Sequence, residues 1–196
     1  MINIKTPREI ELMRVAGEIV GDTHKYIIPF LKPGITTKEI DSLARDYIIK
    51  RGATPSCYNY DGYPGNICIS INDEVVHGIA GSRKLCDGDI VTLDICACYK
   101  GYHGDSAWTY PIGNISKEKE YLLEHTEKSL YEGLRQIKEG ARIGDIGYAV
   151  MQTTPEKATI TYSSNGFWWP QPVENPPKEW AQRQQDLASE RCTILF

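Results

Sequence analysis

Apolar residues recur at helical spacing through most of the first fifty residues. Residues 6–9 form a capping box with proline at the first helical position, and apolar side chains then return every three or four positions until a stop at residues 32–34. A second capping box at residues 36–39 opens another amphipathic stretch, which ends at Gly52. The pattern predicts two helices, each with one apolar face.

Alternation with a period of two replaces the helical period in the middle of the chain. Apolar and polar residues alternate in residues 66–72, which turn-forming residues bound on both sides, and residues 89–99 make a longer strand pattern. Lys100-Gly101 predicts a two-residue turn, after which residues 102–110 return as a second long strand. We therefore expect a β-hairpin at the centre of the fold.

The segment around Gly140 resembles the segment around Gly34. A third helix, capped by Ser116, is expected to run up to Gly140, and another helix follows, as one does after Gly34. This similarity indicates a duplicated α/β unit, although helix–glycine–helix joints are also common in unrelated proteins. A duplication would place a second β-hairpin after Val150. Only one β-like stretch is visible there, at residues 158–162, and we expect no such hairpin.

The character of the chain changes at about residue 153. Three of the 4 tryptophans and five of the 11 prolines lie beyond this point. We therefore divide the chain into a domain of residues 1–152 and a divergent tail of residues 153–196. Three origins of the tail stay open: a frameshift or chimeric join, a degenerate copy, or an alternative ending that packs its tryptophans over the first part.

Composition and charge exclude several classes of protein. With 41% hydrophobic and 24% charged residues, the chain is neither disordered nor fibrous. A net charge of -4 argues against a general electrostatic surface for nucleic acid or membrane. We see no apolar run of the roughly 18 residues that a membrane span needs, and no signal-peptide pattern. A cytoplasmic protein with 6 reduced cysteines is expected.

Two aspartates of the predicted hairpin carry the strongest candidate chemistry. With a two-residue turn, Cys96 lies opposite Asp105. Asp94 and Asp105 then become diagonal neighbours on one face, with Cβ atoms roughly 7 Å apart or less. Two carboxylates at this spacing can bridge two divalent cations. A turn of odd length would place them on opposite faces, and ordinary exposed aspartates are the alternative.

Histidines are weaker candidates for chemistry. His77 follows a predicted strand and precedes a glycine, where a polar side chain can enter a site. His103, two residues before Asp105, is compatible with either a site role or a structural role. His24 and His125 fall within predicted helices, where we expect both to be exposed to solvent.

Five sequence motifs together resemble type I methionine aminopeptidase of the bacterial kind. They are Cys57-x-x-Tyr60-x-Gly62-Tyr63-Pro64, Cys68-Ile69-Ser70-Ile71-Asn72, Val75-Val76-His77-Gly78-Ile79, Gly88-Asp89-Ile90-Val91-x-Leu93-Asp94 and Gly101-Tyr102-His103-Gly104-Asp105-Ser106-Ala107. The resemblance covers roughly residues 1–152. It implies the pita-bread fold, an α/β (α+β) fold of two pseudo-symmetric halves, with the first half complete here and the second truncated or replaced.

The resemblance also implies an activity and its residues. The family removes the N-terminal methionine of nascent proteins with two divalent metal ions (Co, Mn, Fe or Zn). Asp94 and Asp105 match its first two metal-ligand carboxylates, and His77 matches the catalytic histidine that contacts the substrate near the scissile peptide. The positions that match the lining of the methionine pocket are Cys57, Tyr60, Tyr63 and Cys68.

This chain lacks other residues that the resemblance implies. The family completes its metal site with a histidine and two glutamates from its second half, and a second histidine there contacts the substrate. No histidine follows His125 in this sequence. We therefore expect weak or no activity from this chain, and a catalytically inactive binding module or a degenerate product is the alternative. A creatinase- or prolidase-like relative is disfavoured, because residues 57–63 match methionine aminopeptidase better.

Overall fold

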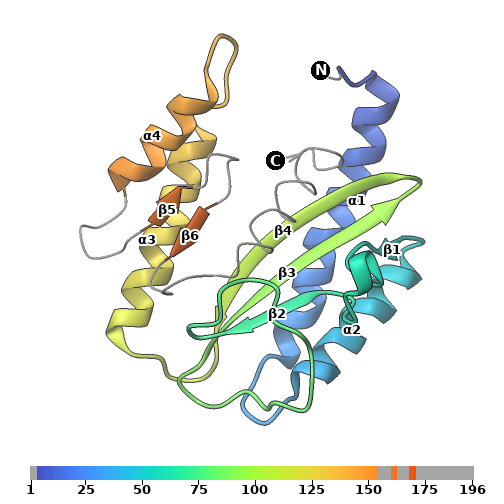
Figure 1. Ribbon diagram of the computed structural model, residues 1–196, viewed down its shortest axis with the longest axis vertical. Coiled ribbons are helices and arrows are strands. Elements are labelled where there is room, and N and C mark those ends of the chain that lie inside the picture. Colours follow the sequence, from blue (N-terminus) through green and yellow to red (C-terminus); the bar gives the residue numbers. More distant parts are fainter. Residues whose placement is uncertain (1–3, 154–159, 163–167, 171–196) are drawn as a thin grey trace. The chain divides into compact units, whose positions relative to one another are not determined.

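The protein is described from a computed structural model, which covers residues 4–153, 160–162 and 168–170. Its helices and strands are α1 (Pro7–Ile27), α2 (Thr37–Lys50), β1 (Thr54–Pro55), β2 (Cys68–Ile71), β3 (Ile90–Tyr99), β4 (Tyr102–Pro111), α3 (Lys117–Leu134), α4 (Ile143–Thr153), β5 (Ile160–Tyr162) and β6 (Trp168–Pro170), with short 3-10 turns at Ile28–Phe30 and Tyr60–Gly62. The described residues form two compact units, one of residues 4–115 and one that begins at residue 116 (Figure 1).

Strand β3 is the centre of an antiparallel sheet in the first unit. It pairs with β4 along its whole length, and on its other side with β1 and β2 (Figure 1). Lys100 and Gly101 both have positive φ, at 50° and 84°, as a two-residue hairpin turn of matching twist requires. The predicted turn and the predicted opposition of Cys96 and Asp105 are confirmed.

Helices α1 and α2 cover one face of this sheet. Every second residue of β3 is completely buried there among aliphatic side chains of the two helices. The strand residues on this face are Val91, Leu93, Ile95 and Ala97, and the helix residues include Ile19, Ile27, Ile40 and Ile48. The opposite face of β3 carries polar side chains and is only partly buried.

The two predicted capping boxes are present and set where each helix begins. The hydroxyls of Thr6 and Thr36 accept a hydrogen bond from the backbone N–H three residues on, and the glutamate side chains return the bond. The third helix also begins as predicted, with Ser116 as its cap. It ends at Leu134 and not at Gly140. The amides of Gln136 and Ile137 bond to carbonyls three residues back, as in a 3-10 turn, so the α-helical pattern of bonds four residues back stops there.

Helices α3 and α4 pack against each other in the second unit. A Cβ atom on Gly133 would lie 2.8 Å from Val150 Cγ2, so the glycine permits this close approach. Strands β5 and β6 form an antiparallel pair beyond α4, with Ile160 opposite Pro170. Our expectation that no hairpin follows Val150 was therefore wrong. Strand β6 is three residues long and ends in proline, so it is too short to show an alternating pattern.

The duplication and the domain boundary at residue 152 stay predictions. Gly34 and Gly140 both have positive φ and each precedes a helix, as the sequence similarity indicates. Most of the predicted tail, residues 153–196, lies outside the described residues.

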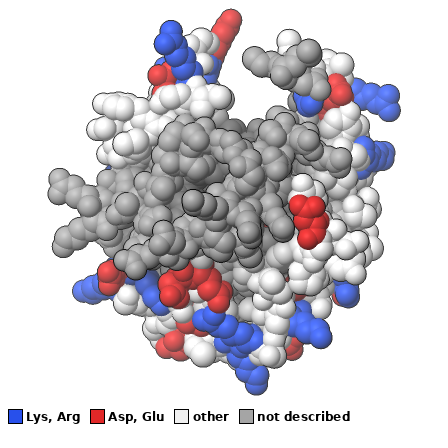
Figure 2. Space-filling view, in the orientation of Figure 1, with Lys and Arg blue, Asp and Glu red and all other residues white. Residues whose placement is uncertain are grey.

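Charged side chains of both signs share the described surface. On the face shown in Figure 2, Lys and Arg are interspersed with Asp and Glu. Among the described helices, none combines the length and the apolar composition that crossing a membrane takes.

Candidate functional site

Asp94 and Asp105 lie on the face of the hairpin that points away from α1 and α2. Asp94 stands opposite Ala107, and Asp105 opposite Cys96, so the two carboxyl groups share one face as diagonal neighbours. Asp94 is partly buried and Asp105 is exposed. Their side chains are joined by a hydrogen bond. The register that the sequence predicted therefore brings the two carboxylates into contact.

The electrostatics of this pair suit a cation. Burial is the main cause that raises the pKa of Asp94 well above its ordinary range, and the negative charge of Asp105 adds to it. The protonated form of the Asp94 carboxyl group is therefore favoured more than in an exposed aspartate. A divalent cation between the two carboxylates would relieve this repulsion, and carboxylate oxygens are the donors that hard and borderline divalent metals bind. The pair fits such a metal as part of a ligand set.

A complete metal site does not appear within the described residues. No group of three or more His, Cys, Asp or Glu side chains among them is arranged to hold a metal ion. Asp94 and Asp105 could thus supply two ligands, and the remaining ligands would come from elsewhere.

Two cysteines adjoin the carboxylate pair. Cys68 lies on β2 directly opposite Asp94, and the thiol of Cys57 donates a hydrogen bond to the sulfur of Cys68. This bond raises the pKa of Cys57 and lowers that of Cys68, because it favours the thiol of the donor and the thiolate of the acceptor. Burial raises the pKa of the neighbouring Tyr63 hydroxyl, and the charge of Cys68 adds to the shift. The five described cysteines form no disulfide.

The loop that carries Cys57 is folded on itself by backbone hydrogen bonds. The amide of Tyr60 bonds the carbonyl of Cys57 at 3.1 Å, and the amide of Tyr63 bonds the carbonyl of Tyr60 at 2.8 Å. The Tyr63 hydroxyl donates to the carbonyl of Gly78 at 2.8 Å. Tyr60 has a side chain that remains 38% exposed. Of the predicted pocket residues, Cys57, Tyr63 and Cys68 therefore form one cluster, and Tyr60 lies at its exposed edge.

His77 lies in the loop after β2, and its neighbour Gly78 fixes it there. Gly78 donates to the Ser70 hydroxyl at 3.2 Å and accepts from the Ile69 amide at 2.9 Å. A Cβ on Gly78 would overlap the carbonyl oxygen of Ile69, so only glycine fits this position. Val76 and His77 both have positive φ, at 31° and 54°, which is strained backbone for such residues. Partial burial lowers the pKa of His77.

Asp41 is a positioning residue that the sequence reasoning missed. It is buried on α2, where its carboxylate accepts hydrogen bonds from the amide of Asn66 at 2.7 Å, the Asn66 side chain at 2.6 Å and the amide of Ile67 at 3.1 Å. These bonds fix the chain at the point where β2 begins. A carboxylate between Ile40 and Ala44, on the apolar side of a helix, was the available signal.

His103 and His24 have defined places in the first unit. The Nδ1 atom of His103 is 2.8 Å from the Ser56 hydroxyl, on the same face as Asp105. His24 is only 7% exposed and bonds to β4, so the expectation that it is solvated was wrong. The helical pattern placed it on a helix, but a strand covers that side of α1. His125 is partly exposed, so the expectation that it is solvated holds only in part.

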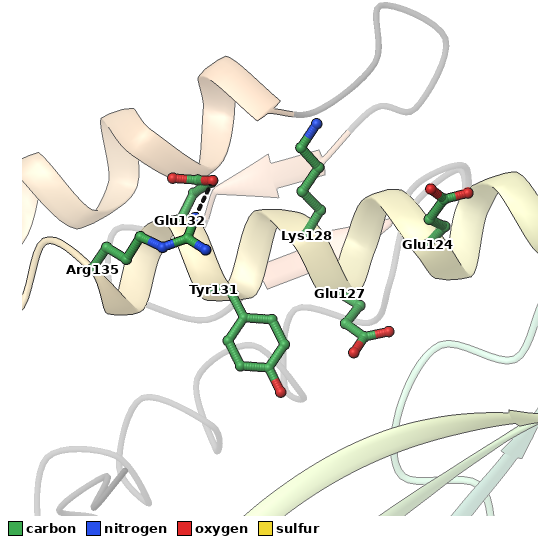
Figure 3. A pocket seen from close by; sticks show the side chains of 6 residues that line it. All are labelled: Glu124, Glu127, Lys128, Tyr131, Glu132 and Arg135. Atoms are coloured by element: carbon green, nitrogen blue, oxygen red, sulfur yellow. Dashed lines mark hydrogen bonds and ion pairs between the residues drawn. The ribbon is translucent and has the colours of Figure 1, made fainter.

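A shallow depression along α3 does not include any of the predicted site residues. Its lining side chains are Glu124, Glu127, Lys128, Tyr131, Glu132 and Arg135 (Figure 3). Glu132 and Arg135 form an ion pair one helical turn apart. Charged side chains along one helix are typical of a solvated face, so we assign the depression no role.

The hairpin, the carboxylate pair and the adjoining thiols belong to a protein of the mixed α/β class, in which one face of the sheet carries candidate metal ligands. A sequence profile of metallopeptidase family M24 matches residues 11–172, twenty residues beyond the boundary at residue 152. The chain belongs to this family.

Named relatives agree with that membership. The chain is 55% identical over 150 residues to "Methionine aminopeptidase 1" of Bacillus subtilis, covering 76% of this chain and 60% of the relative. The methionine aminopeptidase of Rickettsia prowazekii has a TM-score of 0.76 at 35% identity, covering 78% of this chain and 62% of that one. The Xaa-Pro dipeptidase of Bacillus anthracis has a TM-score of 0.68 at 26% identity, covering 76% and 41%.

These comparisons confirm the pita-bread fold and the resemblance to type I methionine aminopeptidase. They also limit what the chain contains. It spans about 60% of the length of the curated relatives it matches.

Proposed function

We propose that this chain carries the first half of a methionine aminopeptidase site, which acts on the N-terminal methionine of nascent peptides. The observation that supports it is the contact of the Asp94–Asp105 pair with a cluster of thiols and a tyrosine. The Bacillus subtilis relative, at 55% identity, bears the name of this activity. Nascent chains as substrates would place the reaction in the cytoplasm.

The two carboxylates are proposed as ligands for two divalent metal ions, drawn from Co, Mn, Fe and Zn. When bound, such ions activate water and polarise a carbonyl group. The proposed role of Asp94 and Asp105 is to hold the cations next to the cluster of Cys57, Tyr63 and Cys68. In the metal-free state, burial and the negative charge of Asp105 raise the pKa of Asp94 and so favour its protonated form.

Cys57, Tyr60, Tyr63 and Cys68 are proposed to bind the methionine side chain. A thioether packs well against polarizable sulfur and aromatic ring edges. The loop reaches His77 through the bond from Tyr63 to Gly78, so the pocket and the histidine are held in one arrangement. His77 is proposed to contact the substrate near the scissile peptide. Its lowered pKa keeps the ring neutral near pH 7 and able to donate or accept one hydrogen bond.

We propose that the chain by itself is weakly active or inactive. Two carboxylates leave most of a dinuclear ligand set unfilled, and catalytic geometry needs a supported ligand shell. No histidine follows His125 in the sequence, so a histidine ligand cannot come from residues 126–196.

The test is cleavage of a Met-Ala-Ser peptide, with Mn²⁺ binding measured in parallel by electron paramagnetic resonance. The variants are Asp105→Asn and, as a matched control, Asp46→Asn, which alters an exposed carboxylate paired with Arg45. We expect weak Mn²⁺ binding that Asp105→Asn abolishes and Asp46→Asn preserves, with little or no turnover.

Each other outcome overturns one part of the proposal. Metal-dependent turnover that is lost in Asp105→Asn would show that the chain is active after all. Mn²⁺ binding unchanged by Asp105→Asn would remove the metal site. Faster cleavage of an X-Pro peptide than of Met-Ala-Ser would remove the substrate assignment.

A further inference from the structure

A buried histidine joins helix α1 to strand β4. The Nε2 atom of His24 lies 3.2 Å from the carbonyl oxygen of Ser106, and its Nδ1 atom lies 3.0 Å from the hydroxyl of Tyr110. His24 is 7% exposed, and its ring centroid is 6.0 Å from that of Tyr110. Both ring nitrogens are therefore engaged with the same strand.

The partners define the protonation state of the ring. A carbonyl oxygen only accepts, so Nε2 carries the hydrogen and donates it to Ser106. In the neutral ring Nδ1 is then an acceptor, and the Tyr110 hydroxyl donates to it. Burial lowers the pKa of His24, and burial raises the pKa of Tyr110 to about 12, so both groups are uncharged at neutral pH. Every polar atom of the ring is satisfied in this state.

These bonds hold the strand directly beside Asp105. Ser106 follows Asp105 in β4, and successive side chains of a strand face opposite sides of the sheet. His24 belongs to α1, which covers the face opposite to the Asp105 side chain, so its bond to the Ser106 carbonyl holds the backbone from that face. On the other side of Asp105, a Cβ on Gly104 would lie 2.5 Å from the Ala16 carbonyl oxygen. Helix α1 thus contacts the β4 backbone immediately before and immediately after Asp105.

We propose that neutral His24 is a positioning residue for Asp105, fixing the strand on which this carboxylate is presented to metal. The inference rests on the proposed role of Asp105 as a metal ligand. Outer-shell partners of this kind typically change metal affinity 10- to 100-fold when they are removed. His24 acts through the peptide backbone, so its removal should change the geometry of the carboxylate without deleting a ligand.

The test compares three variants in the full chain. His24→Leu removes both hydrogen bonds but keeps apolar volume, whereas His24→Gln can still donate to Ser106 and accept from Tyr110. Thr23→Val is the structural control, because Thr23 is buried beside His24 and its hydroxyl bonds to the Ile19 carbonyl within α1, at 2.6 Å. Mn²⁺ affinity is measured at a temperature where all variants are folded.

We expect His24→Leu to weaken Mn²⁺ binding roughly ten-fold. His24→Gln should recover most of that loss, and Thr23→Val should leave the affinity unchanged. Equal losses in His24→Leu and Thr23→Val would overturn the proposal, because the effect would then follow stability alone. An unchanged affinity in His24→Leu would overturn it as well.

A second readout separates this inference from the proposed function. If the unmodified chain binds no Mn²⁺, the metal site fails, but amide hydrogen exchange still tests the role of His24. His24→Leu should speed exchange at residues 105–107 more than at residues 91–93, whereas Thr23→Val should not change this ratio. A ratio that His24→Leu leaves unchanged would overturn the positioning role.

Discussion

The two faces of the β3–β4 hairpin share one backbone but differ in burial and in polarity. On the face that packs against α1 and α2, here called the rear face, Leu93 and Ile95 are completely buried. On the opposite face, here called the front face, Asp94 is only partly buried, and its carboxyl group lies against that of Asp105. One residue of displacement along the strand thus separates a position that stabilises the fold from one that costs stability.

The comparison indicates why the front face can tolerate such a cost. Burying an aliphatic side chain contributes about 1.5–3 kcal/mol, and the rear face of β3 buries several. A carboxyl group that is desolvated beside another carboxyl is unfavourable until a cation neutralises it. Burial on the rear face therefore offsets the free energy that is lost by placing two carboxyl groups together on the front face.

The largest effect is expected from truncating the rear face. Leu93→Ala should lower the free energy of unfolding by about 2–5 kcal/mol, since it leaves a cavity under the sheet. Cys98→Ala, on the front face of the same strand, should cost much less because Cys98 is only partly buried. Urea denaturation of both variants measures the contrast. Equal losses would mean that the two faces do not differ in the way we describe.

A somewhat smaller effect is expected where α1 meets the hairpin. Gly104→Ala should destabilise the protein by about 1–3 kcal/mol, because its Cβ would overlap the backbone of Ala16. Gly17→Ala is the matched control, since a Cβ at Gly17 has nothing within 4 Å and alanine favours helix. The control should be neutral or stabilising. A neutral Gly104→Ala variant would show that α1 and β4 have room to separate.

Replacing Asp94 by an uncharged side chain of the same shape should act in the opposite direction. The native pKa of Asp94 is raised, so the unfolded chain loses its proton first, and the metal-free protein loses stability as pH rises from about 4 towards that raised pKa. Asp94→Asn should abolish this loss and stabilise the metal-free protein at pH 7 by about 1 kcal/mol, a typical point-mutation effect. Thermal denaturation in chelator between pH 4 and pH 8 measures it, and a destabilised variant would contradict the assigned cause.

The smallest effect is expected from the histidine behind the hairpin. Because the native pKa of His24 is lowered, the unfolded chain takes up a proton first as pH falls below about 6.5. Stability should therefore decrease from pH 6.5 towards the lowered native pKa and level off below it. Tyr110, the titratable group in contact with His24, stays protonated throughout. His24→Gln should lower the urea midpoint at pH 7.5 relative to that at pH 5.5, because the contributions of His77 and Asp94 remain and only that of His24 is lost. The control His125→Gln, at a partly exposed histidine, should leave the difference between the two midpoints unchanged.

The carboxylate pair was predictable because it depends on local rules. Turn residues Lys100 and Gly101 determine the register of the hairpin, and the register determines that Asp94 and Asp105 share a face. The starts of the helices were predictable for a similar reason, since a capping box lies within four consecutive residues.

The supporting residues were harder to predict because their partners are distant in sequence. Asp41 bonds to residues 25 and 26 positions away, and His24 to a residue 82 positions away. Helical periodicity placed both side chains on their helices, but it carries no information about which backbone group would meet them.

The sequence by itself determined where the first three helices begin, the central hairpin and the two acids on one face of that hairpin. Those features follow from turn chemistry, capping and alternation, which act over a few residues. Tertiary structure decided that His24 is buried and neutral, that Asp41 fixes the start of β2, and that the thiols of Cys57 and Cys68 meet beside Asp94. The physical reason is that burial and hydrogen-bond partners depend on how separate segments pack, and only the folded chain brings those segments together.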